Sequence, residues 1–119
     1  FEGLNIEWVV ADMQNLPEEW ELSFDIVLEI HVLQAIPEDI REKAKHFLSP
    51  LVREGGYLVC IGRFRGDGPE PKGPPWPLTG DFIESIGKEL KMIGFDILRR
   101  VDDEPEVRRF RCVWTRSIS

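Results

Sequence analysis

Three polar side chains follow short apolar runs, and their types suit proton transfer and anion binding: Glu29, His31 and Arg63. A histidine titrates near ~6.5, so His31 can remove a proton at neutral pH, and Glu29 can assist or meet a bound ligand. Arg63 can bind an acidic acceptor through two parallel hydrogen bonds. We therefore predict catalytic roles for Glu29 and His31 and a substrate-binding role for Arg63. The alternatives are a partly exposed histidine without a catalytic role and a solvated arginine.

Two further candidates lie in the proline- and glycine-rich stretch 63–78, which we expect to be a long loop. Loops of this length in compact domains often serve as lids or binding loops. Arg65 can add a second positive charge for the substrate, and Trp76, set between prolines, can form a rigid apolar wall. The alternatives are a solvated charge and an aromatic side chain that packs the loop.

The elements that must position these residues alternate between short apolar strands and amphipathic helices. Strands are predicted over 6–11, 24–29, 57–61, 95–101 and 107–115, with helices opening at Pro37 and after Thr79. This order predicts one α/β domain, a mostly parallel Rossmann-like sheet that closes on a C-terminal antiparallel hairpin. Ligands bind at the carboxyl ends of strands in such sheets, so the candidate residues should share one rim.

The helices and turns carry more detailed expectations. The first helix should bury one face, which contains Ile40, Ala44, Phe47, Leu48 and Leu51, and Pro50 should bend or end it. Gly55-Gly56 should form a turn before the third strand. The second helix should bury Phe82, Ile83, Ile86, Leu90 and Ile93 and end at Gly94.

Composition excludes several classes of function. A net charge of −7 argues against nucleic-acid binding, and no apolar run is long enough to cross a membrane. The sequence shows no metal-ligand spacing. Cys60 and Cys112 are predicted to be reduced core residues of a cytoplasmic protein, with a disulfide between them as the alternative. Because the chain opens at Phe1 and has no signal segment, we interpret it as truncated or processed.

The order and spacing of the local sequences resemble the C-terminal portion of class I S-adenosylmethionine-dependent methyltransferases, in a bacterial small-molecule subgroup. The segments that carry the resemblance are WVVADMQNLP, FDIVLEIHVLQAIP, LVREGGYLVCIGR, GPPWPLTGDF and VRRFRCVWTR. The resemblance implies that residues 1–119 run from the third to the seventh strand of one partial domain. It implies methyl transfer to a small-molecule acceptor, which depends mainly on alignment of the reactants and need not show a catalytic dyad.

The resemblance also assigns a donor site. It implies that Asp12 accepts a hydrogen bond from the adenine amino group of S-adenosylmethionine and that Met13 meets the adenine ring. Glu29 would lie near the donor's methionine portion. The alternative for this segment is structural, with Asp12 capping a loop and Met13 filling the core.

The departures from the family shape the remaining predictions. The glycine-rich loop and the first strand are not present, so we expect this chain alone to be a poor enzyme. Exposed strand edges predict association with the missing N-terminal half or with a homo-oligomer partner. The alternative function is a truncated, non-catalytic α/β module for oligomerisation or partner binding. A dinucleotide-dependent oxidoreductase is disfavoured by the terminal hairpin and the lid sequence.

Overall fold

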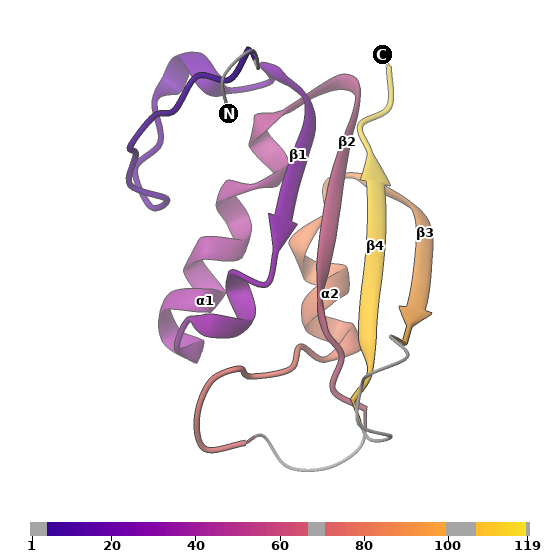
Figure 1. Cartoon of the computed structure of the whole chain (residues 1–119). Helices are drawn as coiled ribbons and strands as arrows, with labels where there is room; N and C mark the ends of the chain where they lie inside the picture. The colour runs from indigo at the N-terminus through magenta and orange to yellow at the C-terminus, as the bar shows by residue number, and fades with distance from the viewer. Residues whose placement is uncertain (1–4, 67–70, 100–106, 119) are drawn as a thin grey trace.

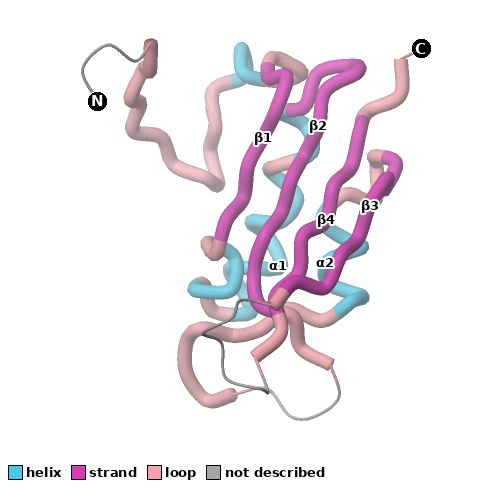
Figure 2. Tube along the Cα trace, turned by 45° about the vertical axis from the view of Figure 1, so that its right-hand side comes forward, coloured by secondary structure: helices cyan, strands magenta, loops and turns pink. Residues whose placement is uncertain are grey.

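The computed structural model describes residues 5–66, 71–99 and 107–118, which form a four-stranded sheet with two helices on it (Figure 1). The strands are β1 (Phe24–Ile30), β2 (Val52–Arg63), β3 (Lys91–Leu98) and β4 (Arg109–Thr115). The helices are α1 (Glu38–Ala44) and α2 (Gly80–Ile86), with 3₁₀ turns at Glu18–Trp20, Leu33–Ala35, Lys45–Phe47 and Ser49–Leu51. Both helices lie on the same face of the sheet (Figures 1 and 2).

The strand order is β1-β2-β4-β3, and it corrects the prediction of a mostly parallel sheet. Only β1 and β2 pair in parallel, whereas β4 pairs antiparallel with β2 on one side and with β3 on the other. The chain returns from β3 and inserts β4 between β3 and β2. That insertion creates two antiparallel ladders, although β1, β2 and β3 point the same way. The predicted antiparallel pairing of the last two strands is confirmed, while their connection at 102–106 lies outside the described residues.

The strand predicted over 6–11 does not form. This segment has no ladder partner among the described residues, and Val10 is fully exposed. The chain then reverses in a tight turn, where the amide of Asn15 donates to the carbonyl of Asp12 at 2.9 Å. A strand requires a neighbouring strand for its backbone groups, so apolar, β-branched composition alone does not place this segment in the sheet.

The predicted turn at Gly55-Gly56 is instead part of β2. Gly55 has a φ of +77°, and a Cβ on Gly56 would lie only 2.8 Å from the Asp25 carbonyl oxygen. Between Phe24 and Ile26 of β1 the register on β2 jumps from Val52 to Tyr57. The two glycines therefore allow β2 to bulge against β1 without losing its place in the sheet.

Helix α1 begins after Pro37, as predicted, but its buried face differs from the prediction. Ile40 is exposed, whereas Arg41 and Lys45 are buried with their cationic groups 5.5 and 5.0 Å from the centre of the Phe82 ring. Cation–π contact and burial of the long aliphatic stems explain this preference. The regular helix ends at Ala44, and the second 3₁₀ turn after it carries Pro50 near its start.

Helix α2 is capped by Thr79, whose hydroxyl accepts a hydrogen bond from the Phe82 amide at 3.2 Å, as the sequence predicts. It ends at Ile86 and not near Gly94, so Leu90 lies beyond it and Ile93 belongs to β3. A Cβ on Gly87 would lie 2.7 Å from the Trp114 ring. The close approach of the backbone to Trp114 marks where the helix stops.

The core fills the space between the two helices and the middle of the sheet. Its buried apolar side chains include Leu58 and Cys60 of β2, Cys112 and Trp114 of β4, and Ile83 of α2. Cys60 and Cys112 are register partners on neighbouring strands, and both are free thiols, which confirms the prediction of reduced core cysteines. One continuous cluster therefore joins both helices to β2 and β4.

Candidate functional site

The parallel pairing of β1 and β2 brings their carboxyl ends to one edge of the sheet. Ile30 lies opposite Ile61, and each strand then passes into a connecting segment at that edge. Figure 2 shows these connections gathered at the lower end of the sheet. The predicted residues Glu29, His31 and Arg63 are therefore near the rim that the sequence indicates, and each side chain is held differently.

The Glu29 carboxylate is buried and has hydrogen bonds on both oxygens. Oε1 accepts from the amides of Val32 and Leu33 at 2.7 and 2.8 Å, and Oε2 accepts from Sγ of Cys60 at 2.8 Å. Glu29 thus fixes the turn that follows β1 and ties it to β2. Contact between Glu29 and a ligand stays a prediction. Such a contact would require the carboxylate to give up one of these three hydrogen bonds and form a bond to the ligand in its place.

Raised pKa values favour the protonated form of both core thiols at neutral pH. Burial raises the pKa of Cys60 far above its usual range, and the neighbouring Glu29 carboxylate raises it further. Burial also raises the pKa of Cys112 to about 12. Because thiolates and not thiols are nucleophiles, neither cysteine is suited to nucleophilic chemistry here.

His31 has a left-handed backbone, with a φ of +59°. Its amide donates to the carbonyl of Ile61 at 2.9 Å, and its Nδ1 is buried with no hydrogen-bond partner in the described part of the chain. A non-glycine residue in this region costs about 1–2 kcal/mol, and such residues concentrate at functional sites. An unsatisfied imidazole nitrogen on strained backbone at the rim is consistent with the predicted proton-accepting role.

Gln34 joins the rim to the loop and was missed by sequence reasoning. Its side-chain Oε1 accepts from the Arg63 amide at 2.6 Å, and its backbone carbonyl accepts from the Trp76 amide at 2.7 Å. The sequence offered only weak signal, a polar residue between a strand and Pro37. Gln34 is the residue that brings Arg63 and Trp76, from distant parts of the loop, to the end of β1.

The loop is anchored at both ends, and it places its two arginines in different cavities. Phe64 and Leu78 form an isolated parallel bridge. Arg63 lines a cavity of about 180 Å³ together with Arg108 and Pro77, whereas Arg65 lines a cavity of about 80 Å³ that includes Arg41. The structure therefore does not bring Arg63 and Arg65, the two arginines predicted to bind substrate, into one pocket.

Asp12 and Met13 adopt the structural arrangement that was the alternative to adenine binding. Oδ1 of Asp12 accepts from the Gln14 amide at 2.9 Å, and Met13 packs against the core. Asp12 remains exposed, so its carboxylate is also open to a ligand. Among the described residues no hydrogen bond or ion pair links it to Glu29, His31 or Arg63.

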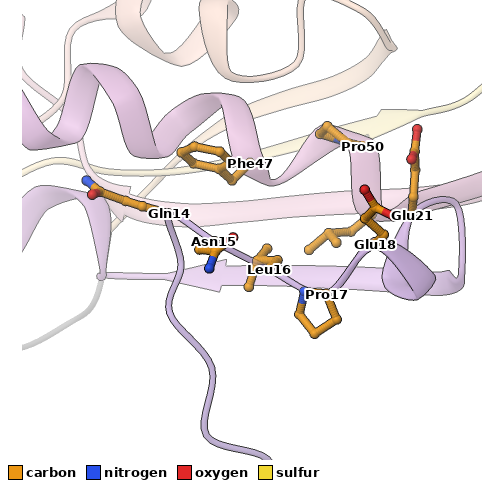
Figure 3. A pocket seen from close by; sticks show the side chains of 9 residues that line it. Gln14, Asn15, Leu16, Pro17, Glu18, Glu21, Phe47 and Pro50 are labelled. Atoms are coloured by element: carbon orange, nitrogen blue, oxygen red, sulfur yellow. The ribbon is translucent and has the colours of Figure 1, made fainter.

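An apolar cavity of about 250 Å³ lies beside this turn (Figure 3). Asn15 and Leu16 form one wall, and Phe47 and Pro50 face them from the far end of the α1 region. Glu18 and Glu21 stand at the opposite end of the cavity from Gln14. The cavity lies between the segment before β1 and the 3₁₀ turns Lys45–Phe47 and Ser49–Leu51, and none of the predicted site residues lines it.

The described residues contain no group of three or more histidine, cysteine or acidic side chains placed to hold a metal ion. No helix among them has the length and apolarity required to span a bilayer.

No protein-family model matches this sequence, and no curated protein does either. Among solved structures, an S-adenosylmethionine-dependent methyltransferase from Methanosarcina mazei aligns with a TM-score of 0.70 at 11% identity, over 95% of this chain and 68% of that one. The 1,6-didemethyltoxoflavin-N1-methyltransferase of Burkholderia thailandensis aligns with 0.69 at 14%, over 92% and 50%. The [4+2]-cyclase SpnF aligns with 0.71 at 10%, over 93% and 56%.

These alignments define the class of fold. The chain has an α/β fold similar to that of S-adenosylmethionine-dependent methyltransferases. It spans between 50% and 68% of the length of the three structures above. At this identity the likeness extends to the fold alone, and a cyclase among the three shows that the fold also serves other chemistry.

Proposed function

We propose that this chain supplies the adenine-binding turn and the acceptor side of a methyltransferase site that acts on a small anionic molecule. The observation that carries the proposal is the fold, which aligns over nearly the whole chain with methyltransferases of known structure. The rim at the ends of β1 and β2 supports it, because open α/β sheets bind ligands there.

The residues present fit only one end of the donor. Asp12 is exposed and can accept a hydrogen bond from an adenine amino group, with Met13 beside it. Among the described residues no glycine-rich turn joins a strand to a helix to hold the ribose and methionine portions. S-adenosylmethionine, when bound, supplies an activated methyl group. The complete site therefore needs contributions beyond those that this chain makes.

The chain's own residues act on the acceptor. Arg63 and Arg108 line one cavity at the end of β2, and two guanidinium groups there favour a carboxylate or another small anion. His31, which follows β1 at the same rim, is the general base in this proposal. Trp76, held by Gln34, can limit the acceptor's position. Catalysis in this proposal comes mainly from holding the reactants in line.

Calorimetric titration with S-adenosylhomocysteine tests the donor half of the proposal. We expect weak binding, with a dissociation constant of about 1 mM or higher, because this chain supplies contacts only to the adenine end of the ligand. Asp12→Ala should abolish it, while Asp39→Ala, an exposed aspartate on α1, should leave it unchanged. Absence of binding to the wild-type chain would favour the alternative, a non-catalytic module.

Nuclear magnetic resonance titration with benzoate tests the acceptor half. Benzoate should shift the amide signals around Arg63 and Arg108, and benzyl alcohol, which lacks the charge, should not. Arg63→Gln should remove the benzoate shifts, whereas Lys91→Gln, an exposed cation at the start of β3, should retain them. Equal shifts from both probes would remove the argument for an anionic acceptor.

A further inference from the structure

The end of β2, the end of β3 and the start of β4 meet at one rim of the sheet (Figure 1). Arg109, the first residue of β4, pairs with Arg63 at the end of β2 and with Leu98 at the end of β3. Arg108 therefore enters β4 between the other two strands, and Arg99 follows β3 directly. Neighbouring strands lie about 4.8 Å apart, so the backbones that carry Arg63 and Arg99 are separated by about 10 Å.

Two cavities adjoin along this row of arginines. Arg63 and Arg108 line the cavity of about 180 Å³ described above, and Arg99 and Arg108 line a second cavity of about 300 Å³. Val107 and Arg108 belong to both linings, so the two cavities are neighbours. Together they fall within the range of about 300–1,000 Å³ that is typical of small-molecule sites. Arg63 and Arg99 lie at the two ends of this space.

The walls of the two cavities are apolar, and their only charges are positive. The lining residues other than arginine are Phe64, Pro77, Ile97, Leu98 and Val107. Within the described part of the chain, Arg63, Arg99 and Arg108 form no ion pair. The carboxylate of Asp96, on β3, is held by Arg111 at 3.1 Å. A cleft lined by charges of one sign attracts ligands of the opposite sign, so this space favours an anion.

The number and spacing of the arginines favour more than one anionic group. A single guanidinium can hold a carboxylate through two parallel hydrogen bonds. A ligand with one carboxylate at Arg63 therefore leaves Arg99, two strands away, without a counter-charge. A ligand with a second anionic group at its other end neutralises both, and its apolar middle lies against Val107.

We propose that the acceptor carries two anionic groups at opposite ends of an apolar body, one held by Arg63 and the other by Arg99, with Arg108 between them. This inference rests on the proposed function. His31 lies beside the end of β2, since its amide donates to the carbonyl of Ile61, and β3 lies two strands further along the sheet. The group at Arg63 is therefore nearer to the reacting atom. The group at Arg99 is a remote anchor, and remote contacts supply binding energy that holds the reacting atom in place.

Three benzene carboxylates test the proposal in nuclear magnetic resonance titrations of the isotope-labelled chain. Benzoate has one carboxylate, terephthalate has two at opposite ends of the ring, and phthalate has two on adjacent carbons. Terephthalate should bind at least about tenfold more tightly than benzoate and should shift amide signals around both Arg63 and Arg99. Phthalate has the same charge as terephthalate but cannot reach both ends, so it should bind at least about fivefold more weakly than terephthalate.

A pair of variants locates the second anionic group. Arg99→Gln should lower the affinity for terephthalate to about that for benzoate, while benzoate binding at Arg63 and Arg108 should not change. Lys88→Gln, which replaces an exposed cation after α2, should leave the affinity for both ligands unchanged. Arg99 and Lys88 are both exposed, and circular dichroism checks that both variants fold.

The outcomes separate this inference from the proposed function. Equal affinities for terephthalate and phthalate, or an unchanged terephthalate affinity in Arg99→Gln, would overturn the acceptor with two anionic ends. In that case, benzoate shifts around Arg63 and Arg108 would leave the proposed anion site intact. If none of the three carboxylates shifts these signals, the acceptor half of the proposed function falls together with this inference.

Discussion

Residues 57–61 and 6–11 are two apolar runs of similar composition, but only the first forms a strand in this molecule. Residues 57–61 lie in β2, paired on one side with β1 and on the other with β4, and Leu58 and Cys60 are fully buried. Residues 6–11 form no ladder, and all six are exposed, including Trp8 and Val10. The comparison teaches that composition sets the tendency to form a strand, while neighbouring backbone decides whether the strand forms and what it buries.

The largest expected effect contrasts two tryptophans from these regions. Trp114 of β4 is 1% exposed, and Trp8 is 76% exposed. Trp114→Ala should lower the free energy of unfolding by about 3–5 kcal/mol because it leaves a cavity in the core, and Trp8→Ala should lower it by less than about 1 kcal/mol. Urea denaturation of both variants measures the difference. Similar losses would mean that the segment before β1 is packed as firmly as the core.

Glu29 extends the contrast to charged residues. Glu29→Ala leaves the amides of Val32 and Leu33 without their acceptor, so we expect a loss of about 2–3 kcal/mol. Glu19→Ala changes an exposed carboxylate in the segment before β1 and should be nearly neutral. The same denaturation experiment compares them. A neutral Glu29→Ala would show that its hydrogen bonds do not stabilise the turn after β1.

The features that could be predicted from the sequence are those that depend on neighbouring residues in the chain. The Thr79 cap, the strands around Phe24 and Tyr57, and the reduced core cysteines follow from side-chain chemistry and short-range pattern. The features that could not be predicted depend on contacts between residues far apart in the sequence. Residues 6–11 join no strand of the described sheet, α2 ends at Ile86 where the backbone of Gly87 approaches Trp114, and the buried Arg41 guanidinium lies over the Phe82 ring.

The same division runs through the candidate site. The carboxyl ends of β1 and β2 could be predicted from alternating strands and helices, and the structure brings them together. The contacts that hold the site could not, since Gln34 meets Arg63 and Cys60 meets Glu29 across about thirty residues of sequence. The roles of Asp12, Met13, Glu29, His31, Arg63, Arg65 and Trp76 toward ligands stay predictions.

Replacing a glycine by alanine adds one methyl group, and Gly87 and Gly73 compare a tightly packed position with an open one. Gly87→Ala should destabilise the chain by about 1–3 kcal/mol, because the new Cβ would lie 2.7 Å from the Trp114 ring. Gly73→Ala, in the loop before α2, meets nothing within 4 Å and should change stability by less than about 0.5 kcal/mol. Thermal unfolding followed by circular dichroism resolves the two. Equal melting temperatures would contradict the close packing at the end of α2.

The last contrast is a pH dependence of the core, which appears only in alkaline solution. Cys112 has a pKa of about 12 in the folded chain against an ordinary value of 9.0, so the folded chain holds this proton more tightly. Its contribution to stability is full below pH 9.0 and is lost as the pH rises towards 12. Stability of the wild-type chain should therefore fall more steeply over this range than that of Cys112→Ala. If stability falls equally with pH in the wild-type chain and in Cys112→Ala, the pKa of Cys112 is not raised by folding, as expected for a thiol in contact with water.

The most direct test of the proposed donor site compares adenosine with inosine, which lacks the amino group that Asp12 would bind. Adenosine is added to the isotope-labelled chain while amide signals are followed by nuclear magnetic resonance. We predict saturable shifts centred on Met13 with adenosine, much weaker shifts with inosine, and loss of the difference in Asp12→Ala. Identical responses to the two nucleosides, or shifts that leave Met13 unmoved, would contradict the assignment of this turn to adenine.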